Sequence, residues 1–220
     1  HTATLSDGPQ HYSLSLDVDF VNNENCTVTI VATQVTDVDA NDPPDAMESD
    51  FTFSFSTEID SPIRINEVDA DTAGSDNMEF IELYDGGVGN TPLDGLVVVL
   101  YNGSDSQSYN DAFDLDGYST NAEGYFLIGN ELVTPTPSII MNNNGLQNGA
   151  DAVALHLGDA VDYPNDTPVS GLGLIDAIVY DTNDSNANGL IDVLTPDQLQ
   201  KNEDDADDKD AHSNSRVPDG

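Results

Sequence analysis

Residues 96–101 read LVVVLY and residues 177–180 read AIVY, two runs in which apolar residues follow one another without a polar break. Strands that are covered on both faces have this composition, whereas strands with one face in water alternate apolar and polar residues. Similar short runs occur at 63–68, 79–84, 124–129 and 152–157, separated by Gly, Asn and Asp clusters. The run at 177–180 is the end of a longer one at 174–180. Nothing between them has the period of a sustained helix. The series predicts an all-β sandwich over residues 63–196.

The residues before this series have a different pattern. Three segments alternate apolar with polar side chains and are rich in Val, Thr and Phe, as half-buried strands are, at 12–20, 26–35 and 50–57. A sandwich of the immunoglobulin type needs about seven strands. We therefore expect the module at 1–58 to be incomplete, either because the chain is cut from a longer one or because another chain completes the sheet.

Two further segments bound the predicted sandwich. Residues 59–62 contain Pro62 and predict a short linker between the modules. After residue 196 the strand pattern fades into the acidic run KNEDDADDKDAHSN, so residues 197–220 are expected to form a solvated tail or loop.

The charge of the chain excludes several classes of protein. Its 220 residues contain 42 Asp and Glu against 4 Lys and Arg, which gives a net charge of −38. Such a polyanion lacks the cations that displace counterions from DNA, so direct nucleic-acid binding is not expected. No run approaches the roughly 18 apolar residues of a membrane span. Cys26 is the only cysteine, which excludes an internal disulfide.

The series from residue 63 resembles the lamin-tail domain, an immunoglobulin-like sandwich of nuclear lamins and of many secreted bacterial proteins. The residues that carry the likeness are, in order, INE at 65–67, EFIEL at 79–83, LDGLVV at 93–98, GYFLIG at 124–129 and DAIVY at 176–180. No single piece is specific, but their order and spacing fit from about residue 63 to residue 192. The resemblance implies a tandem of immunoglobulin-like sandwiches in which this domain is the second.

The first segment looks like the later half of a bacterial immunoglobulin-like domain, on the stretch at 26–57. This pairing of modules is similar to non-catalytic regions of large extracellular nucleases from marine bacteria, in which a separate domain hydrolyses phosphodiesters. The resemblance implies an extracellular or cell-surface location and, as partner, a catalytic domain of the same polypeptide. A cysteine is expected in that group where Val217 stands, so a disulfide there is absent.

Residues that could carry catalysis are few. The histidines are His1, His11, His156 and His212, and only His156 falls on a predicted strand, where it is expected to face solvent or a sheet edge. No orienting partner for a histidine base is evident. We interpret Cys26 as a buried or half-buried structural thiol. The carboxylates Glu67, Glu79 and Glu82, with Asn66, flank two predicted strands and are expected to fix loops rather than to react. We therefore predict that this chain is not itself an enzyme.

The best chemical motif is DSNANGLID at 184–192. Read as a calcium loop, it offers oxygen ligands from Asp184, Asn186, Asn188, the Leu190 carbonyl and Asp192, with Gly189 at the sharp turn. Thr195 stands where such loops carry a bidentate Glu. The alternative is an Asx-rich turn capped by its own side chains.

A second calcium candidate is the loop DVDANDPPD at 37–45, in which Asp37, Asp39, Asn41 and Asp42 crowd together. Like charges so close repel unless water or a cation separates them. The same argument applies more weakly to Asp69, Asp71 and Asp76. The alternative for these two loops is that their carboxylates are simply hydrated at the surface.

Two functions follow as hypotheses. The first is a non-catalytic, calcium-stabilised accessory or spacer region of a secreted bacterial nuclease or related phosphoesterase. The second is a structural or adhesive subunit of a cell-surface layer or extracellular fibre, in which neighbouring subunits complete the first module by donating a β-strand.

Overall fold

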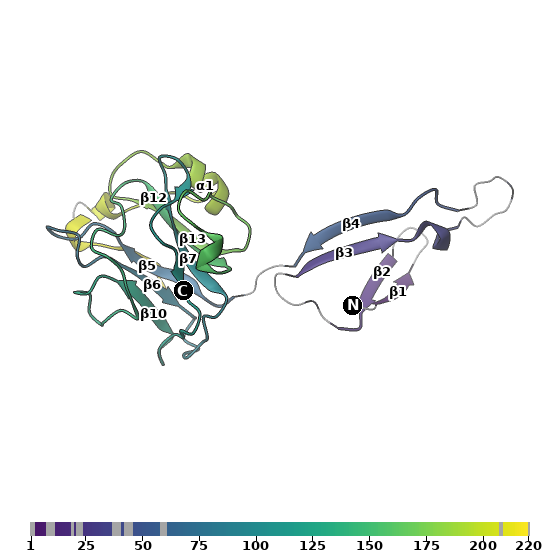
Figure 1. Cartoon of the computed structure of the whole chain (residues 1–220), viewed down its shortest axis with the longest axis horizontal. Helices are drawn as coiled ribbons and strands as arrows, with labels where there is room; N and C mark the ends of the chain where they lie inside the picture. The colour runs from purple at the N-terminus through teal and green to yellow at the C-terminus, as the bar shows by residue number, and fades with distance from the viewer. Residues whose placement is uncertain are drawn as a thin grey trace. The chain divides into compact units, whose positions relative to one another are not determined.

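The computed structural model describes residues 3–7, 12–18, 20, 24–36, 41, 46–57, 61–206 and 209–219. The chain divides into two compact units, His1–Asp60 and Ser61–Gly220 (Figure 1). Both are built from β-strands, and α1 (Asn188–Leu194) is the only α-helix of the described residues. The prediction of an all-β chain is confirmed; the tandem immunoglobulin-like arrangement stays a prediction.

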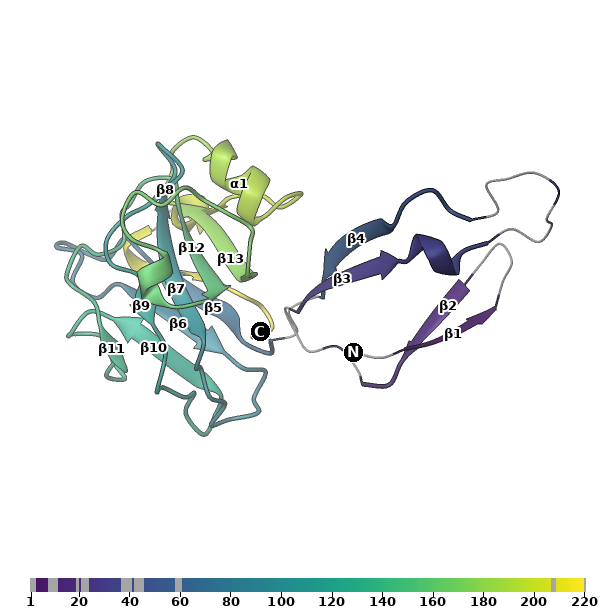
Figure 2. The same cartoon turned by 45° about the vertical axis from the view of Figure 1, so that its right-hand side comes forward.

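The described residues of unit 1 include two antiparallel hairpins, which form separate two-stranded sheets (Figure 2). The first pairs β1 (Ala3–Asp7) with β2 (Tyr12–Leu16), and the second pairs β3 (Asn25–Ile30) with β4 (Phe51–Ser56). The 3-10 helix η1 (Ala32–Gln34) follows β3. The strand predicted at 26–35 is longer than β3, and β1 has no counterpart among the predicted strands.

Unit 2 contains two sheets. The first has the order β11 (Ile139–Ile140), β10 (Tyr125–Gly129), β6 (Phe80–Tyr84), β5 (Arg64–Asp69) and β15 (Asn214–Ser215). The second has the order β14 (Lys201–Asn202), β13 (Leu174–Asp181), β12 (Asp151–Leu157), β7 (Leu96–Asn102) and β8 (Gln107–Ser108), with β9 (Phe113–Asp114) also pairing with β7. Three 3-10 helices complete the unit: η2 (Ala160–Asp162), η3 (Glu203–Ala206) and η4 (Lys209–Ala211).

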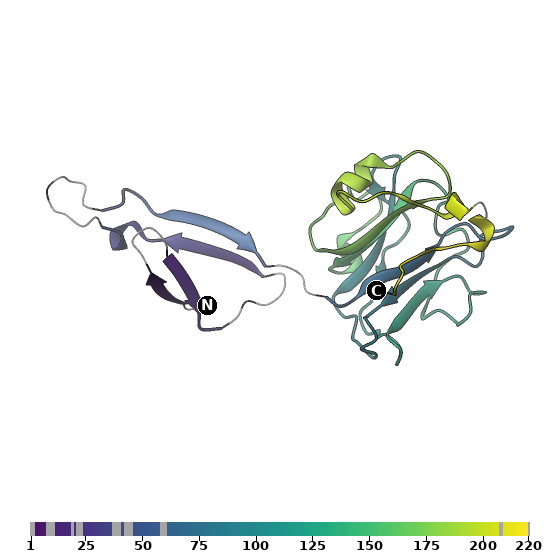
Figure 3. The same ribbon diagram turned by 180° about the vertical axis from the view of Figure 1, so that it is seen from behind.

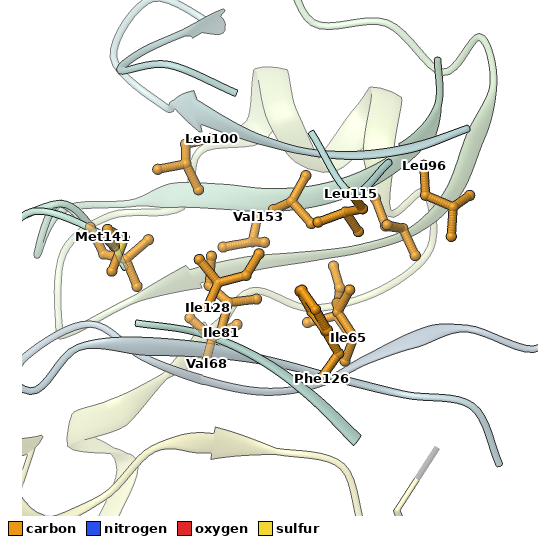
Figure 4. Packing of buried hydrophobic residues seen from close by; sticks show 14 of the residues in the cluster. Ile65, Val68, Ile81, Leu96, Leu100, Leu115, Phe126, Ile128, Met141 and Val153 are labelled. Atoms are coloured by element: carbon orange, nitrogen blue, oxygen red, sulfur yellow. The ribbon is translucent and has the colours of Figure 1, made fainter. Parts of the chain in front are cut away.

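The main hydrophobic core lies between these two sheets (Figure 4). Alternate side chains of β5, β6 and β10 face those of β7 and β12, among them Ile65, Ile81, Phe126, Leu100 and Val153. Burying these side chains removes a large apolar area from water, at about 25 cal/mol per Å², and so holds the two sheets together.

A smaller core covers the other face of the second sheet. There Leu190 and Leu194, one helical turn apart on α1, pack with Val97, Val99 and Val179. The central strands of this sheet are thus covered on both faces, as their continuous apolar runs predict.

The segment at 197–219 differs from the expected free tail. Its strand β14 pairs in parallel with β13, and its strand β15 pairs antiparallel with β5 (Figure 3). Arg216 ties it further, because its Nη2 atom lies 2.7 Å from Asp176 Oδ1 and its Nε donates to the Ile65 carbonyl at 2.7 Å. Of the two expectations for this segment, a tail or a loop, these contacts contradict only the free tail. Strands β14 and β15 have two residues each and are too short to leave a period in the sequence.

Candidate functional site

Three carboxylates meet near the ends of two strands, β9 and β12, that pair with the same strand, β7. Carboxylate oxygens of Asp114, Asp116 and Asp159 lie within 4.8 Å of one another, and no other three His, Cys, Asp or Glu residues of the described part of the chain come together in this way. Asp114 ends β9, Asp116 lies in the next turn, and Asp159 follows β12. Since β9 and β12 both pair with β7, the sheet positions all three.

Hydrogen bonds hold two of these carboxylates in place. Asp114 Oδ1 accepts the N–H of Asp116 at 2.9 Å, and Asp116 Oδ1 accepts the N–H of Gly95 at 2.6 Å. Asp116 and Asp159 are exposed, and Asp114, at the end of β9, also lies at the surface. Oxygen ligands of this kind suit a hard divalent cation such as calcium, which would offset their mutual repulsion.

None of these three residues is among the candidates predicted from the sequence. The local signal was present in the Asp-x-Asp-Gly turn at 114–117. Asp159, however, lies far along the chain, and only the pairing of β7 with both β9 and β12 brings it near.

The predicted calcium loop at 184–192 has a different conformation from the one expected. Helix α1 begins at Asn188, so Gly189 and the Leu190 carbonyl lie within a helix and not in a sharp turn. The loop conformation was wrong because Leu190, fully buried, and Leu194 anchor a helix on the second sheet. Asp184, Asn186, Asn188 and Asp192 are exposed. Ion binding by these residues stays a prediction.

The second calcium candidate falls mostly outside the described residues. Asp37, Asp39 and Asp42 are not among them, and Asn41 is exposed. Calcium binding by the loop at 37–45 therefore stays a prediction.

The third candidate, at 69–76, is held by ordinary polar contacts. Asp71 Oδ2 pairs with Lys209 Nζ at 2.5 Å, and Asp76 Oδ1 accepts the Thr72 N–H at 3.0 Å. Asp69 differs from these two, because its Oδ1 is buried without a hydrogen-bond partner. Burial, and then the carboxylate of Glu67, raise the pKa of Asp69 to about 7.

Two buried glutamates of unit 2 fix loops through backbone N–H groups. Glu79 accepts the N–H of Gly145 at 2.9 Å and of Leu146 at 3.0 Å. Glu203 accepts the N–H of Ala70 at 2.9 Å and of Asp71 at 3.1 Å. Burial raises the pKa of each glutamate to about 7, although these hydrogen bonds oppose the shift. Each carboxylate is thus committed to supporting a loop.

Asp85 has the same kind of role with the opposite pKa shift. Its carboxylate accepts hydrogen bonds from the hydroxyls of Thr91 and Thr120 and from the N–H groups of Val88 and Gly89. Burial raises its pKa, but these four donors outweigh burial and hold the pKa below its usual value.

His156 is fully buried, so the expectation that it faces solvent or a sheet edge was wrong. It lies on β12 at the centre of the second sheet, where the second core and nearby aromatic rings cover it. Its Nε2 lies 3.4 Å from the Tyr101 hydroxyl, its Nδ1 lies 3.3 Å from the Leu172 carbonyl, and its ring lies 5.0 Å from that of Tyr163. Burial lowers the pKa of His156 to about 4, which keeps the ring neutral at pH 7.

The remaining sequence candidates also make contacts within the scaffold. Asn66 Nδ2 donates to Glu82 Oε1 at 2.8 Å, and the Ser213 hydroxyl donates to Glu67. Cys26 on β3 is buried, in accord with its interpretation as a structural thiol. Asn66 and Ser213 line one cavity, whose described lining does not include His156, Glu79 or Glu203.

The described residues therefore define an all-β protein with a sandwich, a highly acidic composition and one set of three convergent carboxylates. No protein-family model, curated protein or solved structure matches the chain. Among the described residues, no helix has both the length and the apolar character needed to cross a bilayer.

Proposed function

We propose that the chain is a non-catalytic, calcium-stabilised accessory region of a secreted bacterial nuclease or related phosphoesterase. The proposal rests on one observation, that buried carboxylates of unit 2 accept hydrogen bonds from loops. Glu79 and Glu203 each accept two backbone N–H groups, and Asp85 accepts four donors, so these groups hold loops instead of meeting a base or nucleophile. The resemblance of residues 63–192 to the lamin-tail domain supports the link to a nuclease.

Calcium has a physical role in this proposal. With 42 carboxylates and 4 basic side chains, the folded chain concentrates negative charge that opposes compaction. A cation held by Asp114, Asp116 and Asp159 would bind the folded state alone, since the three meet only when the sheet forms. Such binding stabilises the folded chain by mass action.

Millimolar calcium is expected to raise the melting temperature of the chain by a few degrees more than sodium chloride of equal ionic strength. The gain corresponds to about 1–2 kcal/mol if calcium is near tenfold its Kd. The double variant Asp116→Asn/Asp159→Asn is expected to lose the calcium-specific part. Asp184→Asn/Asp192→Asn tests the other predicted calcium site in the same way, and Glu123→Gln/Glu131→Gln, at exposed positions outside both sites, is the matched control. Equal shifts with the two salts would show charge screening alone and contradict specific binding.

The adjoining coding sequence tests the accessory role separately. An endonuclease-like domain is expected in the same reading frame as these 220 residues. A reading frame that adds only further β modules would contradict the link to a nuclease and leave the calcium result unaffected.

A second candidate function, strand-mediated assembly of a surface layer or fibre, is favoured by one observation in unit 1. On the β3–β4 hairpin one face is apolar and solvent-exposed, with exposed fractions of 55% for Phe51, 43% for Phe53 and 41% for Ile30. The other face is polar, with hydroxyl pairs such as Thr27–Ser54 at 2.9 Å. Isolated two-stranded hairpins are only marginally stable in water.

In this candidate the occupant of the apolar face is a second copy of the chain. The apolar side chains of this face together expose about 400 Å², if the full surface of each residue is roughly 200 Å². They are Phe20, Ile30, Phe51, Phe53 and Phe55. Two copies would bury about 800 Å² from these side chains alone, and backbone and flanking residues would bring the total near the ~1,000 Å² of a specific interface.

Sedimentation of the full chain tests this assembly. No Lys or Arg precedes Arg64, so the two copies repel, and self-association is expected to strengthen with salt. Phe53→Ser is expected to weaken it at least tenfold, whereas Phe53→Leu and the opposite-face control Thr29→Ala are expected to preserve it. A chain that stays monomeric in high salt at all concentrations would contradict the assembly candidate.

A further inference from the structure

A cavity of about 510 Å³ lies at one side of the sandwich in unit 2, beside β5 and β13. Its walls also come from the segment after α1 and from the segment that contains β15. The N–H of Ile65 on β5 donates to Asp176 Oδ2 on β13 at 2.8 Å, which joins the two sheets at this place. The volume is within the ~300–1,000 Å³ of small-molecule sites.

The charge around this cavity is unlike that of the rest of the chain. None of the described residues that line it is acidic, although 42 of the 220 residues are Asp or Glu. Two of the 4 basic residues, Lys201 and Arg216, line it. Arg216 is committed to Asp176 by two hydrogen bonds of 2.7 and 2.9 Å. Lys201 is exposed and has no ion pair with any described residue, so its ammonium can bind an anion.

A buried hydroxyl in the wall of the cavity lacks a partner. Thr195, at the end of α1, lines the cavity and is 4% exposed, and its Oγ1 makes no hydrogen bond with the described residues. A buried polar atom without a partner is costly, so such atoms normally bind water or a ligand. Ile65 and Val179 form an apolar part of the cavity wall.

We propose that this cavity binds a small organic carboxylate that has an apolar body. The Lys201 ammonium pairs with the carboxylate, the Thr195 hydroxyl donates a hydrogen bond to it, and Ile65 and Val179 cover the apolar part. The two basic side chains and the absence of acidic lining disfavour a metal cation. This binding site goes beyond the accessory role and does not depend on it.

Titration of the full isotope-labelled chain with hexanoate, followed by NMR at 150 mM sodium chloride, tests the proposal. Saturable shifts are expected at amides around the cavity, and hexanamide, which has the same body without the charge, is expected to bind at least about tenfold more weakly. Lys201→Met is expected to weaken hexanoate by a similar factor, whereas Lys201→Arg preserves binding within about threefold. Equal binding of hexanoate and hexanamide, or shifts that do not saturate, would overturn the proposal.

Thr195→Val separates a binding role from a structural one. The hydroxyl has no hydrogen-bond partner among the described residues, so this nearly isosteric variant is expected to melt at the wild-type temperature or above it. Its affinity for hexanoate is expected to fall about fivefold, and Thr195→Ser is expected to restore it. A lowered melting temperature together with unchanged affinity would show that the hydroxyl serves the fold and would overturn its assignment as a ligand contact.

Discussion

Replacing Glu79 with alanine is expected to lower the free energy of unfolding of unit 2 by about 3–5 kcal/mol. The carboxylate is fully buried and accepts the N–H groups of Gly145 and Leu146 at 2.9 and 3.0 Å. Its removal leaves two buried donors without partners, each costing about 1–3 kcal/mol, and opens a cavity. A loss of this size is a large part of the ~5–15 kcal/mol that stabilises a typical domain.

Urea unfolding of the full chain, followed by near-ultraviolet circular dichroism, measures this effect. The buried rings of Tyr101 and Tyr180 report on the second sheet, so the transition of unit 2 is observed directly. Glu131→Ala is the matched control, since Glu131 is exposed, and it is expected to change the free energy by less than about 0.5 kcal/mol. Similar losses for the two variants would show that Glu79 does not hold the loop at 145–146.

The stability of unit 2 is expected to fall by about 2–4 kcal/mol as the pH rises from 5 to 8. Burial raises the pKa of Asp69, Glu79 and Glu203 to about 7 in the folded state, against about 4 when unfolded. Between these values the folded chain binds more protons than the unfolded chain, so the stabilisation is present at low pH and is lost as the pH rises through 7. Asp69 is half-buried, so solvent screening reduces its contribution to this change in the free energy of unfolding.

His156 acts in the opposite direction. Its pKa of about 4 lies below the unfolded value of about 6.5, so the stability it confers is present above pH 6.5 and is lost as the pH falls through 4. One histidine does not cancel three carboxylates, and above pH 6.5 only the carboxylates still change. The net slope is therefore negative between pH 5 and 8.

Melting curves over this range, in low and high sodium chloride, separate the buried groups from the surface charge. Repulsion among exposed carboxylates has the same sign but is screened by salt, whereas the buried groups are screened much less. Glu203→Gln removes one titrating group and is expected to flatten the profile, while Glu123→Gln, at an exposed position, leaves it unchanged. Stability that rises from pH 5 to 8 in high salt would rule out the raised pKa values as its cause.

The strands of unit 2 that are five residues or longer could be predicted because each has a strong local pattern. The apolar run at 96–101 falls in β7 and the run at 177–180 falls in β13, and both strands are central. The two-residue strands β14 and β15 could not be predicted, because partners far along the chain define them. Likewise, His156 alternates with Leu155 and Leu157 as an exposed strand residue would, and only the rings packed over it reveal its burial.

The candidate site was less predictable than the fold. The spacing of oxygen-bearing residues at 184–192 is that of a calcium loop. Leu190 and Leu194, however, have the spacing of a helix face, and their burial against the second sheet favours the helix over the loop. Asp114, Asp116 and Asp159 required knowledge of strand pairing. Thr195 and Lys201 carry no sequence signal at all, since what distinguishes them is an unmet hydrogen bond and the absence of neighbouring acid.

The strands β14 and β15 have a consequence for the biogenesis of unit 2. They are the last strands of the unit in chain order, yet each borders a different sheet, and Arg216 links β5 to β13. A ribosome exposes these residues only after every other strand has emerged. The nascent sandwich therefore keeps this flank open until Arg216 has emerged.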